Sequence, residues 1–100
     1  MKIITKQEAV WFPWEGNTEI EIRSFPYSQL LAGEGFVEGL WSQFNYCVMN
    51  WKGFVDEEGK EYSCNEETKR YLFDYSKKLQ GFVYVKAKEL NDKVLSELKN

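Results

Sequence analysis

The sequence has 100 residues, of which 43% are hydrophobic and 29% are charged, with a net charge of −3 and no histidine. This length suits one domain with one core, and this composition argues against wholesale disorder. Without histidine the chain lacks the commonest general base and the commonest zinc ligand. The negative charge argues against nucleic acid as the main ligand.

No apolar run approaches the roughly 20 residues that cross a bilayer, and we expect no signal peptide, because Lys2 and Lys6 are followed by mixed sequence. We therefore expect a cytoplasmic protein, a single domain over residues 1–100, that does not bind a membrane. The missing catalytic residue types also predict that it is not an enzyme and that it holds no cofactor or metal.

The first segment, residues 1–27, is predicted to consist of strands and turns. Residues 19–23 alternate polar and apolar side chains, as a strand with one buried face does. Residues 15–18 include glycine and asparagine, which suit a turn. Residues 9–12, ended by Pro13, are therefore the candidate partner strand of a hairpin.

A helix is predicted over residues 34–52. Its apolar side chains recur at helical spacing over about four turns: Val37, Leu40, Trp41, Phe44, Cys47, Val48 and Trp51. A competing interpretation makes residues 44–49 a strand, because Phe, Tyr and Val favour sheets. We prefer the helix, since a strand explains only the last part of the stripe. Cys47 lies on this stripe and is expected to be a small core residue. Cys47 and Cys64 lie far apart and do not show the Cys-x-x-Cys spacing of a zinc site.

Residues 54–62 are predicted to form a small hairpin, because two short apolar pieces flank an acidic turn that contains Gly59. The acidic turn does not match a calcium loop, whose ligands occupy alternating positions. Ser63 and Glu66 fit the pattern of a capping box, which opens a helix over residues 64–76.

The last helix, over residues 77–98, is the clearest element, and Ser76 is its candidate N-cap. One stripe carries its apolar side chains and one long amphipathic lysine: Leu79, Phe82, Val83, Lys86, Ala87, Leu90, Val94, Leu95 and Leu98. A helix of roughly 30 Å must pack this stripe on the preceding helix or on another molecule, such as a second copy of the chain. Together the elements predict an α+β, mostly helical fold with an N-terminal strand or hairpin, three main helices and the small hairpin.

Aromatic residues make up 17% of the chain. Those on the 34–52 stripe are expected to pack in the core. Trp11, Phe12 and Trp14 surround Pro13 within four residues and cannot all point inward from one strand. Part of this group is expected either to lie exposed or to seal the edge of the core. Exposed tryptophan is typical of protein interfaces and of platforms that stack sugars or single-stranded nucleic acid.

The stretch Trp51-Lys52-Gly53-Phe54-Val55-Asp56-Glu57-Glu58-Gly59-Lys60, followed by a capped helix, resembles a known family. Small tail-assembly-chaperone-like proteins of tailed phages and prophages often show a Trp-x-Gly-hydrophobic-x-Asp-x-x-Gly stretch between helices. The resemblance covers roughly residues 40–98. The N-terminal layout also resembles that of the family: a strand ends in an arginine, here Arg23, before a helical segment.

The resemblance implies a non-enzymatic morphogenesis protein that binds tail-tube or tape-measure protein while a phage tail is built. It implies structural roles for the motif residues Trp51, Gly53, Asp56 and Gly59. Partner binding is then expected on the N-terminal aromatic group or on the last helix, at Trp11, Phe12, Trp14, Phe82, Leu90 and Val94. The alternative is a small aromatic-rich module that binds carbohydrate or single-stranded nucleic acid.

Overall fold

A computed structural model describes the backbone of residues 9–25 and 35–99, and their side chains except those of Phe36 and of residues 93–99. Its elements are β1 (Val10–Pro13), β2 (Glu19–Ile22), α2 (Phe36–Cys47), β3 (Val48–Lys52), α3 (Glu66–Tyr75) and α4 (Lys77–Lys99). The predicted α+β, mostly helical class and the N-terminal hairpin are confirmed. Residues 1–8 and 26–27 of the predicted first segment, and Glu34 of the predicted helix, lie outside the described residues.

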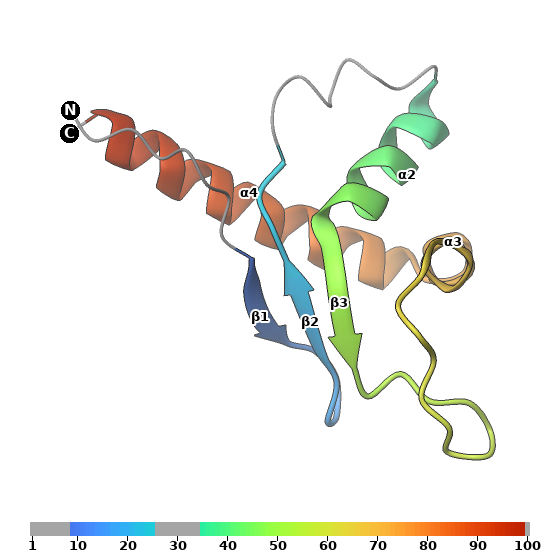
Figure 1. Ribbon diagram of the computed structural model, residues 1–100. Coiled ribbons are helices and arrows are strands. Elements are labelled where there is room, and N and C mark those ends of the chain that lie inside the picture. The colour runs from blue at the N-terminus through green and yellow to red at the C-terminus, as the bar shows by residue number, and fades with distance from the viewer. Residues whose placement is uncertain (1–8, 26–34, 100) are drawn as a thin grey trace.

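The three strands form one antiparallel sheet in the order β1-β2-β3. Phe12 lies opposite Ile20, and Ile20 opposite Trp51, so these side chains share one face. Helix α4 crosses that face (Figure 1), and the buried side chains between the two form the main core. The side chains of Trp11 and Glu21, one position along each strand, lie on the opposite face of the sheet.

The predicted helix over residues 34–52 is wrong in its last five residues, because α2 ends at Cys47 and Val48–Lys52 is strand β3. Val48 lies opposite Ile22 and Asn50 opposite Glu21, so β3 carries Met49 as one extra residue. Such a bulge puts Val48 and Trp51, three positions apart, on the same buried face. The strand therefore imitates the spacing of a helix.

The C-terminal end of α2 is capped by side chains from other elements. A helix leaves its last four carbonyl groups without intrahelical partners. Here the carbonyl of Asn45 accepts from Lys69 Nζ at 3.1 Å, and that of Tyr46 from Arg23 Nε at 2.8 Å. The carbonyl of Cys47 accepts from the Arg23 N–H at 2.9 Å, and Val48 donates to Phe44. Two cations thus complete a helix whose last turn has no basic residue of its own.

Helix α3 begins at a capping box, but not at the predicted one. Asn65 Oδ1 accepts from the Thr68 N–H at 2.9 Å, and Thr68 Oγ1 accepts from the Asn65 N–H at 3.2 Å. The prediction of Ser63 with Glu66 is wrong, because the chain first adopts helical backbone angles after Asn65. The predicted N-cap of α4 is confirmed, since Ser76 Oγ accepts from the Leu79 N–H.

The small hairpin at 54–62 is confirmed as a single antiparallel bridge between Val55 and Glu61. Aromatic packing joins α2 to α3, because the ring of Phe73 lies 5.5 Å from those of both Trp41 and Phe44. Among the helices of the described chain, none is both long enough and apolar enough to cross a membrane.

Candidate functional site: a groove between α2 and α4

The motif residues Trp51 and Gly53 hold the small hairpin against the sheet. Trp51 is buried and donates from Nε1 to the carbonyl of Tyr62 at 2.8 Å. Gly53 has φ +94°, and a Cβ there would lie 2.8 Å from the carbonyl oxygen of Asn17. Any other residue would therefore be strained and would push the β1–β2 turn away.

Asp56 and Gly59 shape the turn of the same hairpin. Asp56 Oδ1 accepts from the N–H groups of Glu58 at 2.9 Å and Lys60 at 3.0 Å. Gly59 has φ +81°, a left-handed conformation that favours glycine. All four motif residues therefore act on local structure, and none of them lines the groove described below.

The N-terminal aromatic group, predicted as a partner surface, divides between the two faces of the sheet. Trp14 packs on Phe82 of α4 with ring centroids 4.6 Å apart, and Phe12 packs against the same core. Lys86 Nζ lies 5.5 Å from the Phe12 ring, and Lys78 lies over Trp14 while pairing with Glu15. These residues seal the edge of the core.

Trp11 lies on the other face, with Lys52 Nζ 4.5 Å from its ring centroid. Of the remaining predicted contact residues, Leu90 is half-buried against the core. The side chain of Val94 lies outside the described residues. The structure thus brings Phe12, Trp14 and Phe82 together but does not bring Trp11 to them.

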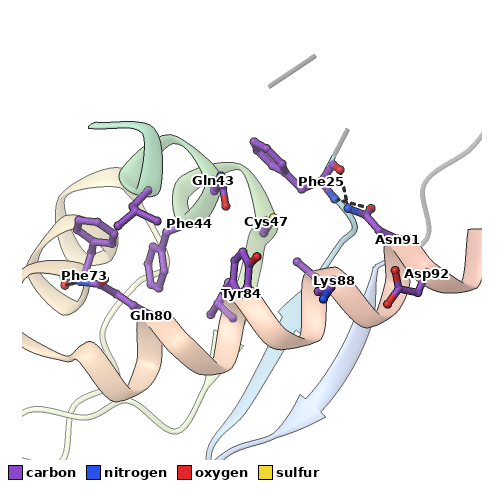
Figure 2. Close-up of a pocket in the computed structure, with 13 residues that line it drawn as sticks. Phe25, Gln43, Phe44, Cys47, Phe73, Gln80, Tyr84, Lys88, Asn91 and Asp92 are labelled. Atoms are coloured by element: carbon purple, nitrogen blue, oxygen red, sulfur yellow. Dashed lines mark hydrogen bonds between the residues drawn. The ribbon is translucent and has the colours of Figure 1, made fainter. Parts of the chain in front are cut away.

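A groove of about 200 Å³ lies between α2 and α4 (Figure 2). Its floor is made of the apolar residues Phe44, Cys47, Val83 and Ala87, which are all buried. Phe73 of α3 lies at one end, and Phe25, which follows β2, lies at the other (Figure 2).

The polar side chains around the groove come mainly from α4. Asn91 holds the Phe25 end, because its Nδ2 donates to the Phe25 carbonyl at 2.9 Å and its Oδ1 accepts from the Phe25 N–H at 3.1 Å. Tyr84 is 55% exposed, and Lys88 and Asp92 are exposed as well. Within the described residues, neither Lys88 nor Asp92 forms an ion pair.

The electrostatics of the groove floor are those of a neutral, apolar surface. Burial raises the pKa of the Cys47 thiol to about 12, although nearby Arg23 opposes the shift. Cys47 is therefore protonated at neutral pH and is no nucleophile. Both cysteines are free, and burial raises the pKa of Cys64 too. In the described part of the chain, no three acidic or cysteine side chains gather where a metal ion would fit.

Sequence reasoning assigned Leu40, Phe44 and Cys47 to the core and did not expect an opening beside them. A signal for the groove does exist in α4. Tyr84, Lys88 and Asn91 follow each other at helical spacing, on the side of the apolar stripe opposite Phe82. The residues that approach α2 are thus amphipathic rather than fully apolar. No known protein family, curated protein or solved structure matches this chain at significant similarity.

Proposed function

We propose that this chain is a non-enzymatic phage or prophage morphogenesis protein, a tail assembly chaperone or adaptor that binds tail-tube or tape-measure protein. The sequence resemblance at residues 51–60 supports this class of protein. The observation that carries the proposal is the open, mostly apolar groove between α2 and α4, because it offers a protein partner a concave surface.

Physical chemistry favours a protein partner at this groove. Removing apolar surface from water is the main favourable contribution to most protein–protein association. The walls are also held in place beforehand, since Arg23 and Lys69 cap α2 and Asn91 holds the Phe25 end. A rigid groove loses little conformational entropy on binding, which favours affinity.

Co-expression tests the proposal directly. The tagged chain is produced with the tail-tube and tape-measure proteins encoded by the same genome, and the purified material is analysed for a stoichiometric complex. We expect one of the two to be recovered. Tyr84→Glu, at the groove, is expected to abolish recovery, whereas Tyr75→Glu, on exposed α3 surface, is expected to leave it unchanged. Recovery of neither tail protein would contradict the proposal.

The alternative function, stacking of sugars or single-stranded nucleic acid, is less favoured by the contacts of the aromatic group. Trp14 and Phe12 already pack on α4, and a lysine lies over Trp11. Stacking needs free ring faces. Quenching of tryptophan fluorescence by an oligosaccharide or by oligo-dT, lost in Trp11→Ala, would favour this alternative instead.

A further inference from the structure

We propose that the groove binds one amphipathic α-helix of a partner protein, and that Lys88 and Asp92 determine the direction in which that helix lies. The inference deepens the proposed function and rests on it only in taking the partner to be a protein. Figure 2 shows the two charged residues at the Phe25 half of the groove.

The walls of the groove favour a helix over an extended peptide. Both walls are α-helices, whose main-chain groups are bonded within the helix except at its ends. An extended segment would enter an apolar groove with its own N–H and C=O groups unpaired, which costs free energy. A helix satisfies these groups internally and needs only a matching apolar stripe.

The dimensions of the groove agree with such a partner. Its α4 wall extends from Gln80 to Asp92, which at 1.5 Å per residue is about 18 Å, or roughly three helical turns. The volume of about 200 Å³ is below the roughly 300–1,000 Å³ of sites for drug-sized ligands. A groove of this volume can hold a few large apolar side chains of a partner helix that itself continues beyond the groove.

Charge complementarity identifies the chemistry of the partner. Lys88 and Asp92 are exposed, are one helical turn apart, and form no ion pair within the described residues. A helix lying along α4 would place an acidic residue beside Lys88 and a basic residue one turn away, beside Asp92. Reversing the helix, with its apolar stripe still facing the groove, would move this acid and base to the α2 wall, away from Lys88 and Asp92. The expected partner helix therefore carries an apolar stripe with one acid and one base beside it.

Synthetic helices test the proposal. Peptides of about 16 residues share one leucine stripe, and two positions beside it, one turn apart, hold Glu/Lys, Lys/Glu or Ala/Ala; binding is followed by fluorescence anisotropy. We expect one charge order to bind about fivefold more tightly than the other. The double variant Lys88→Glu/Asp92→Lys is expected to reverse this preference. Both residues are exposed, so the variant should fold normally.

A matched control exchanges two exposed charges elsewhere, Lys77→Glu with Glu57→Lys, and should keep the original preference. The inference is overturned if no peptide binds at about 1 mM, or if both charge orders bind equally. It is also overturned if the chain dimerises and Tyr84→Glu abolishes the dimer, since the occupant is then a second copy.

The outcomes separate this inference from the proposed function. A tail protein that still binds the Tyr84→Glu chain would refute the groove as its site but leave the proposed function standing. Oriented peptide binding without recovery of any tail protein would support the groove and refute the proposed function.

Discussion

Two sides of α4 each carry an aromatic residue followed four positions later by a lysine, but their surroundings differ. On the sheet side, Phe82 and Lys86 are covered by Trp14 and Phe12 of the hairpin. On the α2 side, Tyr84 and Lys88 stand beside an open groove. Of the aromatics that suggested a binding surface, Phe12, Trp14 and Phe82 thus pack on the core, whereas Trp11 lies on the other face of the sheet. The opening lies beside residues that suggested ordinary helix packing.

Substitutions in the groove floor should lower the free energy of unfolding more than substitutions on the sheet side. Phe44 is buried against Phe73, so Phe44→Ala should lower the free energy of unfolding by about 3–5 kcal/mol. Phe82 is only half-buried, so Phe82→Ala should cost less, about 1–3 kcal/mol. Urea unfolding measures both. Equal losses would mean that the two sides do not differ in this way.

Alkaline pH should lower the free energy of unfolding, because Cys47 is buried in the groove floor. Its thiol stays protonated in the folded state up to a pKa of about 12, whereas the unfolded chain loses this proton above pH 9.0. The unfolded state then binds fewer protons, so stability falls by up to about 1.4 kcal/mol per pH unit between these values. Below pH 9 the contribution is constant.

The matched variant for this prediction is Cys47→Ala, followed by urea unfolding between pH 8 and about 11. Its own stability is lower throughout, but its decline with pH should be shallower than that of the parent chain. Cys64, with a raised pKa, and Lys69, whose pKa burial lowers, act with opposite signs in both proteins. Parallel pH profiles would contradict the assignment to Cys47.

The sheet side should show direct coupling between its two rings. A double-mutant cycle with Trp14→Ala and Phe82→Ala should give an interaction free energy of about 0.5–1.5 kcal/mol, because the ring centroids lie 4.6 Å apart. Trp14→Ala and Tyr84→Ala, on opposite sides of α4, should be additive within about 0.5 kcal/mol. Coupling of the second pair would show that the two sides are not independent.

The smallest effect on stability is expected at the rim of the groove. Tyr84 is 55% exposed, so Tyr84→Ala should change the free energy of unfolding by less than about 0.5 kcal/mol. Thermal unfolding of the purified variant measures this change. A large loss would show that Tyr84 is part of the core and would make it unsuitable as a probe of binding.

Local patterns in the sequence predict the hairpin and the start of α4 because each depends on neighbouring residues. The alternation at Glu19–Ile22 and the hydroxyl of Ser76 act within a few positions. The end of α2 depends instead on a distant partner. Val48–Lys52 pairs with β2 and is therefore a strand. Because Met49 is an extra residue in this strand, the buried residues Val48 and Trp51 are spaced as they would be in a helix. Local propensity does not include that competition.

The groove could not be predicted for a related reason. Periodicity identifies which residues of α2 and α4 are apolar, but not how far apart the two helices lie. The separation depends on how α3 and Phe25 pack at the two ends. The cap of α3 was misassigned because Ser63 and Asn65 are both capping residue types, and only the path of the chain selects between them.

The capping of α2 by Arg23 and Lys69 has a consequence for how the chain folds. The last turn of this helix takes two of its hydrogen-bond donors from Arg23, which follows β2, and from Lys69 of α3. A short isolated segment carrying α2 would lose them and would be only marginally helical in water. Arg23, α2 and Lys69 should accordingly become ordered together, so that substitution of either cation also destabilises the α2 wall of the groove.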